Sequence, residues 1–221
     1  MHNIALLTDF GTADGYDAQL KAVIHSGLPG KVLLTDITHS VPHGNIGFGS
    51  FVLKNSYGVF PPGTVFFSVV DPGVGSARSV IFARSGGYFF LGPDNGLMDW
   101  ALSEHPSGVF EVKKKMRSTF EARDVMAPFL VSVLSGKIKP VFKKRPFRGP
   151  RIITDPSGAE GYSIVYKDHF GNLITNISAE TELKSLVYKS KKIYPAGCYA
   201  EKTPDKRLVK GSSGFWEIAA L

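Results

Sequence analysis

The sequence predicts an α/β protein in two parts: an N-terminal α/β domain with a mostly parallel sheet over residues 1–145, and a small C-terminal β-barrel-like domain over residues 146–221. Three observations predict this. Strand-like apolar runs alternate with helix-like segments in the first part. A basic, proline-rich stretch without periodicity follows at residues 137–156 and is typical of a linker. After it, short strand-like runs are separated by turn residues.

The first elements follow from hydrophobic periodicity. Residues 4–8 form a short apolar strand, and residues 14–26 have helical spacing. A second strand is expected at 32–37 and a helix, weakened by two glycines, at 46–59. Residues 65–70 are apolar on both faces, which is typical of a strand in the interior of a parallel sheet.

The remaining elements are shorter. Residues 80–83 and 88–91 flank a Gly-Gly turn and predict a hairpin. Helices are expected at 96–103 and 125–134. In the second part, strands are expected at residues 162–168, 173–177, 192–194 and 215–220. A domain of about 70 residues is marginal by itself, so we expect it to pack on a neighbour.

Composition bounds the class of protein. The 221 residues are 43% hydrophobic, enough for one large core or two modest ones. The single cysteine excludes an intrachain disulfide and gives no support to a cysteine-based metal site. No run reaches the apolar length that spans a bilayer, and the N-terminus has no basic leader or cleavage site. We therefore expect a cytoplasmic protein.

The chain is basic, with 26 Lys and Arg against 19 Asp and Glu. The excess gathers at residues 113–117, 137–148 and 189–192. Such runs can meet nucleic acid, but here they lack interleaved stacking aromatics and any nucleic-acid signature. A solvated surface is the favoured interpretation, and nucleic-acid binding remains an alternative.

Carboxylates gather at predicted strand ends. Asp9, Asp36, Asp71 and Asp94 each follow or close an apolar run, and ligands of open α/β sheets bind at the carboxyl ends of the strands. Asp71 opens a glycine-rich turn, and Arg78 follows it in the sequence. A carboxylate beside an arginine can orient water and favour its deprotonation. Asp9 suits a grip on vicinal ribose hydroxyls.

Other interpretations of these residues are weaker. Thr12 or Asp14 is expected to cap the first long helix, and His39 to be a hydrogen-bonded structural residue. Asp9, Asp14, His39 and Asp71 could together hold a metal, but their spacing matches no metal-ligand pattern, so we expect no metal. Nucleophile-elbow, Rossmann and P-loop motifs are absent from the sequence.

Seven segments stand in order along nearly the whole chain: LTDFGTAD at 7–14, DITH at 36–39, PGTV at 62–65, DPGVG at 71–75 with Arg78, GPDNG at 92–96, TFEARD at 119–124 and DHFGN at 168–172. Together they resemble the S-adenosyl-L-methionine hydrolases, also called SAM hydroxide adenosyltransferases, which are relatives of the fluorinases and chlorinases. Seven motifs in register are far more specific than any one of them.

The resemblance implies a reaction and an assembly. Members cleave S-adenosyl-L-methionine at C5′ with water, giving adenosine and L-methionine, and no cofactor is implied. They are typically trimers whose ligand lies between the N-terminal domain of one subunit and the C-terminal domain of the next. Asp71 and Arg78 match two members of the family's Asp-Arg-His set. Halogenases carry an aromatic residue in place of Asp71, which argues against halogenation here.

The third member of that set differs in this chain. The family pattern Thr-Phe-His-Gly-Arg-Asp reads Thr-Phe-Glu-Ala-Arg-Asp at 119–124, so Glu121 stands in the place of the histidine. Glu121 cannot act as a cationic histidine would; it could accept a proton from water or pair with Arg78. The departure keeps open an alternative: an adenosyl-ligand-binding protein without catalysis.

The resemblance also implies a set of substrate-binding residues. Asp9 matches the residue that grips the ribose hydroxyls, and Phe120 matches a wall of the pocket. Asn172 matches an adenine contact, and Asp168 matches the partner of the methionine ammonium group. Ser212 resembles the serine that holds the methionine carboxylate.

Overall fold

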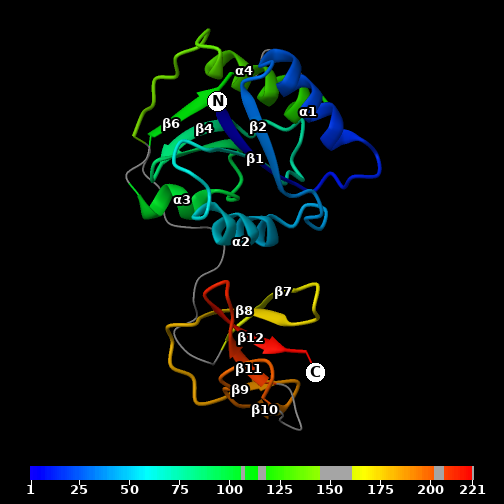
Figure 1. The fold of residues 1–221 in the computed structure, drawn as a ribbon, viewed down its shortest axis with the longest axis vertical. Coiled ribbons are helices and arrows are strands. Elements are labelled where there is room, and N and C mark those ends of the chain that lie inside the picture. The colour runs from blue at the N-terminus through cyan, green and yellow to red at the C-terminus, as the bar shows by residue number, and fades with distance from the viewer. Residues whose placement is uncertain (106–107, 114–117, 145–160, 202–206, 221) are drawn as a thin grey trace. The chain divides into compact units, whose positions relative to one another are not determined.

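A computed structural model describes residues 1–105, 108–113, 118–144, 161–201 and 207–220 of the chain (Figure 1). The chain divides into two compact units, Met1–Ile152 and Ile153–Leu221. The domain boundary predicted between residues 145 and 146 lies outside the described residues and stays a prediction.

Within the described residues of the first unit, one six-stranded sheet has the order β2-β1-β3-β5-β4-β6. Its strands are β1 (His2–Thr8), β2 (Val32–Thr38), β3 (Val65–Val69), β4 (Val80–Ser85), β5 (Tyr88–Pro93) and β6 (Gly108–Val112). Strand β3 pairs in parallel with both β1 and β5, and all its residues are buried. The predicted interior strand is therefore confirmed, as is the β4–β5 hairpin.

Helices cover both faces of this sheet (Figure 1). On one face lie α1 (Tyr16–Gly27), the π-helix η1 (Ala122–Met126) and α4 (Ala127–Leu134); on the other lie α2 (Ile46–Tyr57) and α3 (Asp99–Glu104). Successive residues of a strand point to opposite faces. Accordingly Phe67 packs in the core with α1 and α4, whereas Phe66 packs in the core with α2 and α3.

The start of α1 differs from the prediction. The helix begins at Tyr16, and its N-cap is Gly15, which has a φ of 70° and no side chain to cap the first turn. The expectation that Thr12 or Asp14 caps this helix was therefore wrong. The chain turns through positive φ at both Gly11 and Gly15, which places the cap position after Asp14.

Part of the predicted linker belongs to the first domain. Val109 in β6 and Lys143 exchange two backbone hydrogen bonds of 2.9 Å. The Phe142 ring lies 5.7 Å from the Phe82 ring and 6.4 Å from the Phe89 ring, measured between centroids. The linker prediction is therefore wrong for residues 137–144, because an aromatic side chain anchors them to the core. Its remainder, residues 145–156, lies outside the described residues.

The described residues of the second unit are all β, as predicted. A four-stranded antiparallel sheet has the order β11-β12-β8-β7, and β9 and β10 form a separate antiparallel pair. The bounds are β7 (Ile164–Lys167), β8 (Leu173–Ser178), β9 (Leu186–Tyr188), β10 (Lys191–Ile193), β11 (Arg207–Lys210) and β12 (Phe215–Ala219). Ile177, Trp216 and Ile218 lie in the core of this unit.

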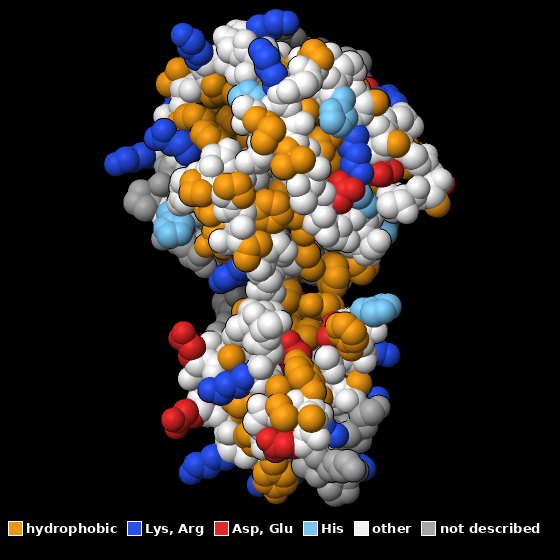
Figure 2. All heavy atoms as spheres, in the orientation of Figure 1, with side chains coloured by type: hydrophobic (Ala, Val, Ile, Leu, Met, Phe, Trp, Pro, Cys, Tyr) orange, Lys and Arg blue, Asp and Glu red, His pale blue; other side chains and the backbone are white. Residues whose placement is uncertain are grey.

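One face of the molecule shows how the basic side chains are distributed there. On the face drawn in Figure 2, Lys and Arg side chains lie scattered among apolar and neutral ones and do not gather into one patch. This face therefore lacks the continuous basic stripe that nucleic-acid binding needs. Residues 114–117 and 145–148 of the basic runs lie outside the described residues.

Candidate active site

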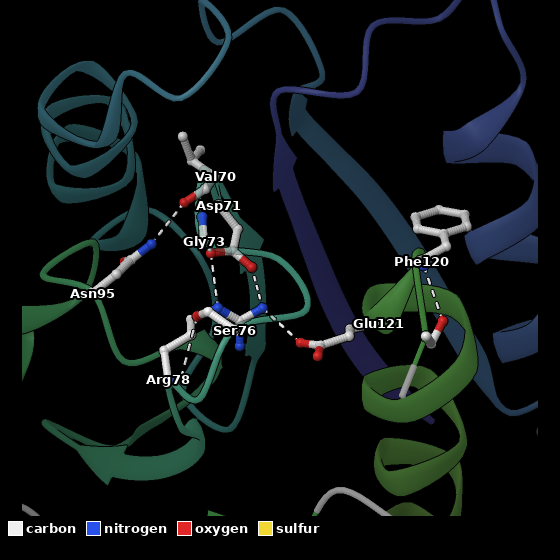
Figure 3. A network of polar contacts seen from close by, with 9 residues as sticks. Val70, Asp71, Gly73, Ser76, Arg78, Asn95, Phe120 and Glu121 are labelled. Carbon is white, nitrogen blue, oxygen red and sulfur yellow. Dashed lines mark hydrogen bonds and ion pairs between the residues drawn. The ribbon is translucent and has the colours of Figure 1, made fainter. Parts of the chain in front are cut away.

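Asp71 follows Val70, just beyond the end of the buried strand β3, and lies in a turn that presents its carboxylate to Arg78 (Figure 3). The backbone N–H of Gly73 donates to Asp71 Oδ1 at 3.1 Å. Arg78 Nε donates to the same oxygen at 2.8 Å, and Arg78 Nη2 donates to Asp71 Oδ2. This is a bidentate pair, the strongest and most directional contact between these two side chains.

Glu121 joins the pair from a distant part of the chain. Arg78 Nη2 donates to Glu121 Oε2 at 2.6 Å, and the Glu121 side chain is only 3% exposed. Burial lowers the pKa of Arg78, but the hydrogen bond and charge of Asp71 and the charge of Glu121 outweigh burial and raise it. The guanidinium therefore stays charged between two carboxylates. Among the described residues, its buried Nη1 has no hydrogen-bond partner.

The segment at 92–96 supports the strand that presents Asp71. Asn95 Nδ2 donates to the backbone oxygen of Val70 at 2.8 Å (Figure 3), and its Oδ1 accepts from Leu97 N at 3.2 Å. A Cβ at Gly92 would lie 2.2 Å from the backbone oxygen of Ser68 in β3, so only glycine fits there. This motif therefore fixes the strand end that leads to Asp71.

A cavity of about 320 Å³ lies beside the pair. Three carboxylates line it, from Asp9, Asp71 and Glu121, together with Phe10, Tyr16, His43, Val69, Val74, Thr119, Phe120, Ala122 and Met126. The Phe120 ring centroid lies 5.2 Å from those of both Phe10 and Tyr16, in edge-to-face contact. The cavity thus has an aromatic side and an acidic side.

Asp9 lies at the end of β1, and its carboxylate is held by the neighbouring loop. Asp9 Oδ2 accepts from the backbone N–H of Gly44 at 2.9 Å, and His43 Nδ1 lies 3.6 Å from the same oxygen. The side chain is 7% exposed and lines the cavity. The hydrogen bond fixes the position of this carboxylate at the cavity wall.

His39 has a structural place. It is buried, its Nδ1 lies 2.7 Å from Thr8 Oγ1, and its Nε2 lies 3.1 Å from Asp36 Oδ1. It joins the ends of β1 and β2 and does not line the cavity. No group of three His, Cys, Asp or Glu side chains in the described part of the chain is placed to hold a metal ion.

A π-helical turn positions Phe120 and Glu121. The Phe120 carbonyl accepts from the backbone N–H groups of Arg123 and Asp124, and η1 begins at the residue after Glu121. Hydrogen bonds from Arg123 and Ser118 lower the pKa of Asp124 and keep it ionised in this turn. Single π-helical turns occur often at functional sites, and this one places two predicted site residues at the cavity wall.

Asp168 and Asn172 are bound to each other in the second domain. Asp168 Oδ1 accepts from Asn172 N at 2.7 Å, and Oδ2 accepts from Asn172 Nδ2 at 2.9 Å. Asn172 Oδ1 accepts from the backbone N–H of Ala220 at 2.9 Å. A carboxamide has two donors and two acceptor lone pairs, so one donor and one lone pair of Asn172 remain for a ligand.

Ser212 lies in the turn between β11 and β12. The backbone N–H of Gly211 donates to Phe215 O at 2.9 Å, and that of Gly214 donates to Gly211 O at 3.1 Å. Ser212 itself is exposed. The predicted site residues thus fall into two sets: five gathered in the first domain around Asp71, and three in the second.

Sequence reasoning missed several residues at these places. Tyr16, His43 and Thr119 line the cavity but received no role from the sequence. Glu217 is buried in β12, beside the turn that carries Ser212. The available signal for Tyr16 was its place just after the Asp9 segment. For Glu217 it was a charge inside an apolar strand, a pattern that needs an explanation.

Comparison with known proteins shows which family the chain matches. Residues 4–141 match the SAM hydroxide adenosyltransferase N-terminal domain, and residues 162–220 match the C-terminal domain of the same family. An (R)-S-adenosyl-L-methionine hydrolase from Methanocaldococcus jannaschii is 32% identical over 186 residues, covering 80% of this chain and 67% of that protein. A protein of the same name from Thermus thermophilus is 32% identical and covers 80% and 75%.

A more distant relative and a solved structure are also similar to this chain. A fluorinase from Actinopolyspora mzabensis is 28% identical, covering 79% of this chain and 71% of that protein. The crystal structure of an uncharacterized conserved protein from Thermotoga maritima superposes with a TM-score of 0.79, at 28% identity, over 97% of this chain and 91% of that one. Both domains, in order and in fold, place this chain in the SAM hydroxide adenosyltransferase family.

Proposed function

We propose that this protein hydrolyses S-adenosyl-L-methionine at C5′, giving adenosine and L-methionine. The observation that carries the proposal is the bidentate Asp71–Arg78 pair, placed at a cavity that also presents Asp9. The relatives named (R)-S-adenosyl-L-methionine hydrolase support the same reaction.

The chemistry asks little of the protein. The oxygen of water forms a bond to C5′ while the C5′–S bond breaks. The electron pair of the C5′–S bond goes to sulfur and gives the neutral thioether of methionine. A sulfonium is already a good leaving group, so no general acid is needed. Orienting water in line with the C5′–S bond supplies several kcal/mol, about 7–11 in the best cases. Asp71 orients this water and accepts one of its protons as the bond to C5′ forms, and the proton then passes to bulk water.

Charge favours this substrate over an anionic one. With both carboxylates ionised, Asp71, Glu121 and Arg78 together carry one net negative charge. Such a site attracts a sulfonium cation and repels a halide ion. Water is therefore the proposed nucleophile, and halogenation is not.

The binding roles follow the two sets of residues. Asp9 grips the ribose hydroxyls and Phe120 forms a wall of the pocket. Asn172 meets the adenine, Asp168 the methionine ammonium group and Ser212 the methionine carboxylate. These roles rest on matched positions, and the remaining donor and lone pair of Asn172 are compatible with the adenine edge. No metal or cofactor takes part in the proposed reaction.

We further propose a homotrimer with the ligand at the interface between subunits, in the cytoplasm. Support comes from the family membership and from the division of the site residues between two domains. No helix in the described ranges has the length and apolar character to cross a membrane. Light scattering of the purified chain tests the assembly: a mass three times that of the chain is expected, and a monomer at all concentrations contradicts it.

The reaction is tested by incubating the purified protein with S-adenosyl-L-methionine and following adenosine and methionine by chromatography. Both sulfonium epimers are offered separately. Equal amounts of adenosine and methionine, absent with the Asp71→Asn variant, are expected. Methylthioadenosine or no product at all contradicts the proposal.

Glu121 supports a second candidate: an adenosyl-ligand-binding protein without turnover. Its contact with Arg78 at 2.6 Å draws the guanidinium toward a second carboxylate, where the family pattern has a histidine. The same experiment separates the two functions. A thermal shift with adenosine or S-adenosyl-L-methionine, without product, favours the binding protein.

A further inference from the structure

Glu217 is a buried carboxylate that the proposed reaction does not use. It lies in β12, and 4% of the residue is exposed. Tyr199 donates its hydroxyl to Glu217 Oε2 at 2.6 Å, and Ser213 Oγ lies 3.5 Å from Glu217 Oε1. Burying a carboxylate costs stability even when it is hydrogen-bonded, so its presence in a strand core points to a role other than packing.

The carboxylate is packed against the turn that carries Ser212. A Cβ added to Gly211 would lie 1.8 Å from Glu217 Oε1, so the acid touches the backbone where the turn begins. Gly211 has no positive φ, which means that the close approach, and not the backbone conformation, demands glycine there. One oxygen of Glu217 thus supports the turn, while Tyr199 holds the other oxygen in place.

The same strand reaches the Asp168–Asn172 loop. Glu217 pairs with Ile174 in β8, and Ala220, just after β12, donates to Asn172 Oδ1. Burial, and then the charge of Asp168, raise the pKa of Glu217. Glu217 therefore stands between the two segments to which the methionine end of the substrate is assigned.

We propose that Glu217 is a positioning residue for the amino-acid end of the substrate: it holds the Gly211–Gly214 turn so that Ser212 and Asp168 meet one methionine together. The inference rests on the proposed function for the identity of the ligand. It assigns Glu217 no contact with the reacting atoms. It requires that contacts of Glu217 govern methionine affinity and leave adenosine affinity alone.

The test is the binding of L-methionine, in saturating adenosine, and of adenosine alone, measured by calorimetry on the full-length chain. Gly211→Ala forces a methyl group against Glu217 and is expected to weaken L-methionine binding about tenfold or more, with adenosine binding unchanged. Glu217→Ala is expected to do the same. Glu217→Gln keeps an acceptor for Tyr199 and a polar group for Ser213, and is expected to restore most of the affinity.

Gly197→Ala is the matched control. A Cβ there would also meet a carboxylate, Glu201 Oε1 at 2.7 Å, but Glu201 is exposed, so its side chain can swing aside at the cost of the hydrogen bond that it accepts from Gly197 N. Unchanged L-methionine binding in Gly211→Ala overturns the inference, and so does an equal loss of adenosine binding. If Glu217→Ala fails to fold, Gly211→Ala alone decides. These binding measurements do not depend on turnover. A wild-type protein that binds adenosine and L-methionine but does not hydrolyse S-adenosyl-L-methionine therefore contradicts the proposed reaction and leaves the inference about Glu217 intact.

Discussion

Arg78 Nη2 donates to Asp71 and to Glu121 at once, and the Glu121 contact measures 2.6 Å. The residue in the place of the family histidine is therefore the second acceptor of the same guanidinium. Pairing with Arg78 is one of the two roles that the sequence left open for Glu121, and in this structure Glu121 makes that pair. Because Glu121 also pairs with Arg78, the positive charge of the guanidinium is shared between two carboxylates and stabilises the Asp71 carboxylate less.

Replacing Asp71 by asparagine should separate chemistry from binding. Asp71→Asn keeps the shape of the side chain but removes the charge that orients and deprotonates water. Turnover is expected to fall by about 10²–10⁴-fold. The dissociation constant for adenosine, measured by calorimetry, should stay the same because adenosine carries no reacting sulfonium. Asp14→Asn, an exposed aspartate near the start of α1, is the control and should retain full activity.

Replacing Glu121 by histidine should raise turnover severalfold. The variant removes the second carboxylate from Arg78, so the guanidinium then pairs with Asp71 and not with Glu121. The same variant should lower the free energy of unfolding. Removing one partner of a buried ion pair destabilises a protein by about 3–5 kcal/mol unless the new side chain finds partners. Initial rates of adenosine formation and thermal unfolding are measured together. An unchanged rate in a folded variant means that Glu121 already does what the histidine would do.

The sequence predicted the interior of the sheet well because apolar runs signal burial directly. Strand β3 is apolar except for Ser68 and is paired on both sides. Strand β9 escaped prediction because it has only three residues. Strand β11 escaped prediction because it is short and a charged residue stands at each of its ends. Residues 137–144 resembled a linker by composition, and one aromatic contact of Phe142 decided otherwise.

The site was predictable where its residues are close in sequence. Asp71 and Arg78 flank one glycine turn, so their pairing follows from local geometry. Glu121 reaches Arg78 across 43 positions, and no local pattern encodes such a contact. His43 reaches the cavity for the same reason, since the fold alone brings its loop beside Asp9, whereas Tyr16 lies just after the Asp9 segment in the sequence.

Asp168 and Asn172 should show opposite selectivity although they are bonded to each other. Asn172→Ala removes the amide proposed to contact adenine and is expected to weaken adenosine binding about tenfold, with little effect on L-methionine binding. Asp168→Asn removes the charge for the ammonium group and should weaken L-methionine binding more than adenosine binding. Both variants lose a hydrogen bond of the loop, so each serves as the stability control for the other in calorimetric titrations. Equal losses of both ligands in both variants contradict the assigned roles.

Glu217 should make the stability of the protein depend on pH, with a predictable sign. Burial and the charge of Asp168 raise its pKa in the folded chain, against the opposing hydrogen bond from Tyr199. The pKa of a glutamate in an unfolded chain is about 4.3. Between that pH and the pKa of Glu217 in the folded chain, the native state therefore binds more protons than the unfolded state. Stability contributed by Glu217 is therefore present below the unfolded pKa and falls as the pH rises toward the folded pKa.

Glu217→Gln cannot ionise and should escape that loss. Its melting temperature is expected to exceed that of the wild type by about 2–4 °C at neutral pH and to converge with it near pH 4. Scanning calorimetry of both proteins from pH 4 to 8 measures the difference, with Glu182→Gln, an exposed glutamate of the same domain, as the control. A difference that is constant with pH, or that grows on acidification, would show that Glu217 is not the titrating group.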